Sequence, residues 1–271
     1  MVLPVGDVNP THRAPVLTWL LLLANAAVFL LVQVPLPECE ARAFTYTWGA
    51  VPAELTGAGP LHPGDLEQLL GECADAVGTV GTVSPTSVWL SLLTAMFVHG
   101  NLGHLVGNLL FLYVFGNNVE DRLGKVRYLA FYLVGGIAAT LAFVALQPDS
   151  TVPLVGASGA IAAVLGAYLI VWPRAKVFTF VPFPLYLIAL IVPGVRIRSF
   201  WFLFAIVSLP AWLLLGGWIG FQTWAARSAL ADGTAYSAHV AGFVAGIVLL
   251  LLLDRRRQRR GQPTFHPTRP R

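Results

Sequence analysis

The chain has 271 residues, of which 56% are hydrophobic and 11% are charged, and its mean hydropathy is +0.72. An average soluble domain carries roughly 25% charged residues. The composition therefore excludes an ordinary soluble domain, a disordered chain and a secreted disulfide scaffold, and it indicates a protein that lies in a bilayer. The formal net charge of +4 does not indicate a nucleic-acid partner, because the basic residues stand in short runs beside apolar segments.

Six windows are long and apolar enough to cross a bilayer as helices. About 20 apolar residues span the roughly 30 Å of hydrocarbon, and a spanning segment must satisfy its own backbone. The windows cover residues 16 to 34, 102 to 118, 128 to 146, 157 to 172, 199 to 220 and 234 to 253. The sequence thus predicts an all-α, polytopic membrane protein with six transmembrane helices and a long external loop between the first two.

Lysine and arginine set the orientation, since both favour the cytoplasmic side. With six crossings and a cytoplasmic N-terminus, every basic residue except Arg42 and Arg227 falls in the cytoplasm. We therefore expect a multi-pass protein of the cell membrane with both termini in the cytoplasm. Its expected parts are a cytoplasmic N-terminus (1–15), a membrane domain (16–253) with an external loop at about 35–88, and a disordered basic tail (254–271) that contacts membrane lipids.

One further window, residues 177 to 195, is free of charge but contains Pro182, Pro184 and Pro193. Proline removes helix donors, and a crossing here would place the C-terminal arginines outside. We interpret this window as an interfacial or re-entrant stretch, with a seventh span as the alternative.

Both cysteines, Cys39 and Cys73, lie in the expected external loop. Thiols outside the cytoplasm can oxidise, and a bridge that closes a loop of this size would stabilise the fold by about 3–4 kcal/mol. Two unpaired thiols are an equally good interpretation, so the sequence leaves the pairing open.

Polar side chains inside the apolar windows are candidates for function, because they are costly at membrane depth. His104 and Asn108 are four residues apart on one helix face at the start of the second window, and His99 stands just before it. Ser158 opens the fourth window, and His239 lies early in the sixth. With the orientation set by the basic residues, all of these groups share one shallow external depth, which favours a single site.

A serine becomes a nucleophile when a histidine within hydrogen-bond reach accepts its proton, and the attacked carbonyl then needs donors for its negative charge. We assign Ser158 as the nucleophile and His239 as the general base. Asn108 and His104, with the Ser158 backbone N–H, are the expected oxyanion donors. Asp232 is seven residues before His239, about 10 Å along a helix, so no acid is expected to complete a triad.

Small residues at helical spacing line one face of the fourth and sixth windows: Gly159, Ala163, Gly166, Gly242 and Gly246. Such faces let two helix backbones approach closely. They are expected to bring Ser158 to His239, with Gly156 and Gly159 forming a tight turn around the serine.

Four motifs follow one another between Leu90 and Leu253. They are His99-Gly-Asn-Leu-Gly-His104-Leu-Val-Gly-Asn108, Glu120-Asp-Arg122-Leu-Gly124, Gly156-Ala-Ser158-Gly159 and Ala238-His239-Val-Ala-Gly242-Phe-Val-Ala-Gly246. Together they resemble the rhomboid family of intramembrane serine proteases.

The resemblance implies a six-helix core whose active site opens to water on the external side. It also implies cleavage of transmembrane protein substrates within or beside their helices, without metal or cofactor. By position in the motifs, Ser158 and His239 would be catalytic and His104 and Asn108 would bind the oxyanion. His99 would be structural, and Glu120 with Arg122 is expected to tie the cytoplasmic loop together.

Two positions depart from the pattern of many relatives. Trp89 is followed by Leu90 where many relatives carry an arginine, and Ala162 stands where some carry a tyrosine that stacks on the catalytic histidine. His239 therefore needs another support, which the sequence does not identify.

Three alternative functions remain to be compared with a protease. A metalloprotease is disfavoured, because no HExxH motif occurs and His99 and His104 are five residues apart. A transporter is disfavoured, because the polar groups lie on one side rather than at the midplane. A catalytically inactive rhomboid-like protein that binds transmembrane clients is the open alternative, although it would normally lack the serine or the histidine.

Overall fold

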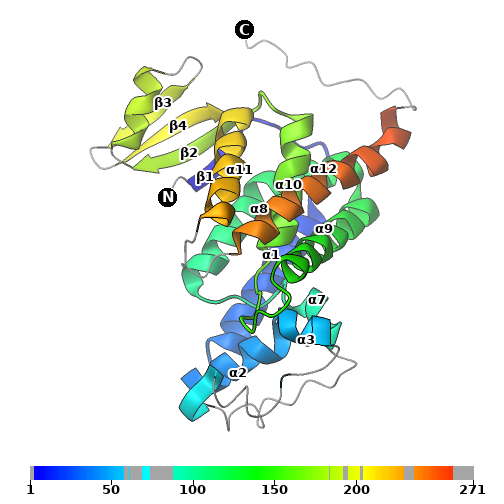
Figure 1. Ribbon diagram of the computed structural model, residues 1–271. Helices are drawn as coiled ribbons and strands as arrows, with labels where there is room; N and C mark the ends of the chain where they lie inside the picture. The colour runs from blue at the N-terminus through cyan, green and yellow to red at the C-terminus, as the bar shows by residue number, and fades with distance from the viewer. Residues whose placement is uncertain are drawn as a thin grey trace.

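The computed structural model describes residues 3–57, 61, 69–73, 88–182, 184–191, 195–201, 204–228 and 235–258. The main helices are α1 (Val16–Ala27), which continues as a π-helix to Gln33, α8 (Leu102–Leu123), α9 (Lys125–Leu146), α10 (Ser158–Val171), α11 (Ala211–Arg227) and α12 (Tyr236–Gln258). Shorter helices are α2 (Glu38–Trp48), α3 (Pro52–Gly57) and α7 (Ser91–Thr94). The long helices form a bundle, with a small sheet beside one end and α2 and α3 at the other (Figure 1).

Three helical segments of the described chain are long and apolar enough to cross a membrane: Val16–Gln33, Lys125–Leu146 and Tyr236–Asp254. α10 is a shorter apolar helix. Gly124 has a φ of +76°, so it ends α8 and lets α9 begin at the next residue. These segments support a membrane protein.

α10 forms the centre of the bundle. It packs against α8, α9, α11 and α12, and every side chain from Ala160 to Tyr168 is buried. Small side chains dominate its first turns, so its neighbours approach closely around the end that carries Ser158.

The all-α prediction is wrong for one region, because four strands form an antiparallel sheet in the order β1-β2-β4-β3. The strands are β1 (Leu3–Asp7), β2 (Lys176–Pro182), β3 (Arg196–Trp201) and β4 (Phe204–Pro210). β1 belongs to the predicted N-terminal segment, and β2 with a 3-10 helix at Leu185–Leu190 occupies much of the window 177–195. The described part of that window is therefore no spanning helix.

The predicted fifth span, 199–220, is also wrong at its start. Strands occupy the described residues as far as Pro210, and the helix runs from Ala211 to Arg227. An apolar run cannot by itself distinguish a buried strand from a helix. Pro210 lacks an N–H and would break the hydrogen bonding inside a helix, and it stands at the position just before α11.

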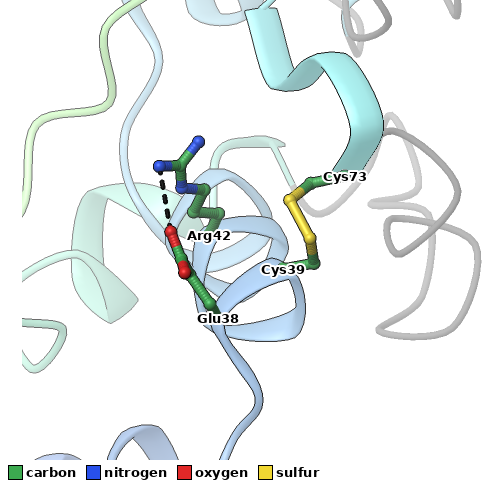
Figure 2. Close-up of a disulfide and its surroundings, with 4 residues drawn as sticks. All are labelled: Glu38, Cys39, Arg42 and Cys73. Atoms are coloured by element: carbon green, nitrogen blue, oxygen red, sulfur yellow. Dashed lines mark hydrogen bonds and ion pairs between the residues drawn. A yellow bond between two sulfur atoms is a disulfide. The ribbon is translucent and has the colours of Figure 1, made fainter.

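The segment between α1 and α8 contains α2 and α3, while residues 58–60, 62–68 and 74–87 lie outside the described part. A disulfide joins Cys39 of α2 to Cys73, with Cα atoms 4.9 Å apart (Figure 2). Arg42 pairs with Glu38 one turn away on α2, at 3.2 Å. The bridge decides the pairing that the sequence left open.

Charged side chains connect the helices at the end of the bundle opposite α2 and α3. Glu120 of α8 accepts hydrogen bonds from the backbone N–H groups of Leu17 (3.0 Å) and Thr18 (2.7 Å), so it caps α1. Arg122 donates to Asp254 of α12 at 2.7 Å. Of the predicted tail, residues 259–271 lie outside the described residues. The two motif residues therefore join the ends of three helices.

Candidate active site

Ser158 begins α10 directly after a tight turn. Gly156 in this turn has a φ of +108°, which residues other than glycine rarely adopt. Its N–H donates to the carbonyl of Ala95 at 2.8 Å. The N–H groups in the first turn of any helix lack intrahelical partners, and in α10 no side-chain cap bonds to them next to the serine hydroxyl. These N–H groups form the positive end of the helix dipole, which can stabilise a negatively charged oxygen.

His239 lies in the first turns of α12, and its Nε2 is 2.8 Å from Ser158 Oγ. Backbone contact between α10 and α12 brings the two side chains together. A Cβ on Gly242 would collide with the carbonyl oxygen of Gly159, and one on Gly246 would collide with the backbone of Ala163. The close approach predicted from the small-residue faces is confirmed.

His104 and Asn108 of α8 face the turn before Ser158. A Cβ on Gly156 would lie 2.6 Å from His104 Nε2 and 3.3 Å from Asn108 Nδ2. Asn108 is buried, and within the described chain its Nδ2 has no hydrogen-bond partner. Buried donors without partners are rare in native structures, so this amide is free to meet a polar atom of a substrate.

His99 lies behind His104 rather than beside the serine. It is 1% exposed, and Gln33 holds its backbone N–H and carbonyl in two hydrogen bonds of 2.9 Å. Its Nδ1 is 3.2 Å from the carbonyl of Phe97, and its ring lies 5.2 Å from that of His104. Burial, with His104 nearby, lowers the pKa of His99 to about 4, so the ring is neutral and suits a structural contact.

Two residues of α11 contact His239, and the sequence analysis missed both. Gln222 is 6% exposed, and its Oε1 lies 2.9 Å from His239 Nδ1. The ring of Trp218 lies beside the imidazole in a tilted arrangement, with 5.9 Å between centroids and an interplanar angle of 34°. Trp218 supplies the aromatic contact that Ala162, which is fully buried, cannot make.

For Gln222 the reason is the misplaced fifth span. The predicted span ends at residue 220, which leaves Gln222 outside the apolar windows. A helix started after Pro210 would have included it. Asp232, the acid considered for a triad, lies outside the described residues.

The site therefore joins a hydroxyl, an imidazole and a free amide donor at the junction of α8, α10, α11 and α12. No group of three or more His, Cys, Asp or Glu side chains that could hold a metal ion occurs among the described residues. The arrangement suits transfer of the serine proton to the imidazole during attack on a carbonyl.

Comparison with known proteins identifies the family. Residues 86–256 match the sequence profile of the rhomboid domain. The chain is 30% identical over 187 residues to Rhomboid protein 1, mitochondrial, of Saccharomyces cerevisiae, which covers 64% of this chain and 45% of that protein. It is 29% identical over 187 residues to Rhomboid protease AarA of Providencia stuartii (62% and 57% covered) and 41% identical over 83 residues to Rhomboid protease GluP of Bacillus subtilis (31% and 16%).

The chain thus spans about half the length, or less, of these three relatives. The profile match, in contrast, covers more than half of the chain and includes all four motifs. This chain is a membrane protein that belongs to the rhomboid family.

Proposed function

We propose that this chain is an intramembrane serine endopeptidase that hydrolyses peptide bonds within or beside transmembrane segments of other membrane proteins. The observation that carries the proposal is the 2.8 Å separation of Ser158 Oγ and His239 Nε2, on helices far apart in the sequence. The names of two relatives, which are called rhomboid proteases, support the same activity.

Ser158 and His239 then act together in a two-step reaction. His239 Nε2 accepts the proton of Ser158 as Oγ bonds to the substrate carbonyl carbon. The C–N bond breaks when the imidazolium returns that proton to the leaving amine. A water molecule, deprotonated by the same imidazole, then hydrolyses the acyl-enzyme and regenerates the hydroxyl.

Asn108 and His104 are the proposed donors to the oxyanion, together with the Ser158 N–H. The unpaired Nδ2 of Asn108 supports this role, because a donor that is already satisfied would gain less from the developing charge. One such donor is worth about 3–4 kcal/mol in the transition state. Gly156, Gly159 and Gly242 act indirectly, through the turn and the helix contact that place Ser158.

The proposed orientation follows the basic residues. We place both termini in the cytoplasm of a six-span protein of the cell membrane, with the dyad opening to the external side. Glu120 and the pair of Arg122 with Asp254 place charged groups at the end of the bundle far from Ser158, which supports this orientation. Client helices that unwind easily should be preferred, because each exposed amide costs several kcal/mol in hydrocarbon.

Cleavage of a model transmembrane substrate by the full chain in detergent tests the proposal. Ser158→Ala and His239→Ala should each lower kcat by about 10⁴-fold or more. Ser208→Ala and His12→Ala are matched controls, because Ser208 lies in β4 of the sheet and His12 is exposed near the N-terminus. Retained cleavage in Ser158→Ala would reject the assignment, and a folded wild-type protein without cleavage would favour an inactive client-binding protein.

A further inference from the structure

Gln222 occupies the place next to His239 where a serine protease triad has its carboxylate. It stands on α11, its side chain is buried, and its Oε1 is 2.9 Å from His239 Nδ1. The other ring nitrogen faces Ser158 Oγ at 2.8 Å. The three side chains form a chain of two contacts, from the Gln222 amide to the imidazole and from the imidazole to the Ser158 hydroxyl.

We infer that Gln222 is a positioning residue that sets the tautomer of His239, an inference that rests on the proposed protease function. An amide oxygen can only accept, so the contact to Oε1 requires a hydrogen on Nδ1. Nε2 then keeps its lone pair and can accept the proton of Ser158. The opposite tautomer would turn the lone pair of Nδ1 toward Oε1 and leave the serine hydroxyl without a base.

α11 also fixes the plane of the ring. Trp218 and Gln222 are four residues apart and therefore lie on one helix face. The Trp218 ring packs beside the imidazole and also contacts Phe243 of α12, at 6.3 Å between centroids. Because both supports of His239 come from α11, the dyad keeps its working geometry only while α11 is packed on α12.

The ionisable surroundings of His239 allow this role to be read from a pH profile. Within the described chain, the bonds of the imidazole go to Gln222 and Ser158 alone. His104 of α8 interacts with His239 electrostatically, Tyr236 lies one turn earlier on α12, and Arg227 ends α11. α9 and α10 bring no charged side chain to this end of the bundle.

The test compares Gln222→Leu, which removes the acceptor, with Gln222→Glu, which accepts but carries charge. Gln222→Leu should lower kcat about 10- to 100-fold with little change in KM. In Gln222→Glu a carboxylate would stabilise the protonated imidazole, so activity on the acid side should be lost at a higher pH than in the wild type. Thr223→Val is the control, since within the described residues the Thr223 hydroxyl donates only to Ile219 of its own helix.

A second measurement does not depend on activity. Nitrogen NMR of the full chain with labelled histidine should show the Nδ1–H tautomer for His239 in the wild type and a mixture in Gln222→Leu. Unchanged kcat and an unchanged tautomer in that variant would overturn the inference. If Gln222→Leu fails to fold, Gln222→Glu decides: a shifted acid limb supports the role and an unshifted one overturns it. Activity that survives Ser158→Ala would instead reject the protease function itself.

Discussion

The two helix contacts that meet at His239 are built in opposite ways. α12 touches α10 backbone to backbone, where Gly242 lies against the carbonyl of Gly159. α12 touches α11 through side chains, with Trp218 on the imidazole and Gln222 bonded to it. The glycines of α11 show the same contrast, because a Cβ on Gly216, Gly217 or Gly220 would meet nothing within 4 Å.

The difference separates two requirements of the dyad. The distance between hydroxyl and imidazole is set by backbone contact, which has no side-chain torsions to adjust. The direction of the imidazole is set by side chains, which can rotate or be exchanged. Changes at the contact between α10 and α12 should therefore lower both activity and thermal stability. Changes at the contact between α11 and α12 should lower activity and leave the fold intact.

The largest expected effect comes from breaking the backbone contact. Gly242→Leu forces α10 and α12 apart, and a displacement of about 1 Å already costs on the order of 10²-fold in rate. We expect a loss of cleavage of at least about 10³-fold and a lower thermal midpoint, with Gly242→Ala in between. Gly217→Leu on α11 is the control, and equal losses in both leucine variants would contradict the contrast between the contacts.

Two asparagines of α8 should divide activity from stability. Asn108→Ala should lower kcat by about 10²–10³-fold without lowering the thermal midpoint, because Nδ2 has no partner to lose among the residues that the structure describes. Asn118→Ala should do the reverse, since the Asn118 amide donates to Asp7 at 3.0 Å. Kinetics and thermal unfolding of both variants check this, and a destabilised Asn108→Ala would assign that residue to the fold.

The smallest effect concerns pH and a group far from the dyad. Burial raises the pKa of Asp7, although Tyr168 and Asn118 donate hydrogen bonds to its carboxyl. Ionisation of Asp7 therefore disfavours the folded state. The stability that protonated Asp7 contributes is fully present below its ordinary pKa of 3.8 and is lost as the pH rises through its raised pKa in the folded state. Thermal midpoints of the wild type should fall relative to Asp7→Asn between pH 4 and pH 7, whereas exposed Asp149→Asn should run parallel to the wild type.

Much of the helical fold could be predicted from the sequence, because the cost of exposed backbone in hydrocarbon forces long apolar helices. The windows at 102–118, 128–146 and 157–172 correspond to α8, α9 and α10, and the small-residue faces lie where α10 meets α12. The sheet could not be predicted in this way, since β2 and β4 are apolar runs and β2 pairs with β1, which lies far away in the chain.

The site residues could be predicted only where a polar residue type stands inside a correctly placed apolar window. Ser158, His239, His104 and Asn108 stand out as polar groups in apolar helices, and the structure brings them together around one turn. Gln222 is equally polar and buried, but its helix was placed too early in the sequence. Because strand β4 ends at Pro210, the helix begins at Ala211 and reaches far enough to include Gln222, whose amide contacts the imidazole.

Labelling by a serine-directed fluorophosphonate, located by mass spectrometry, tests most directly whether His239 activates Ser158. The account predicts one modified residue, Ser158, in the folded wild type, and almost none in His239→Ala. Equal labelling of Ser158 in that variant, modification of another serine, or no labelling of the wild type would contradict it.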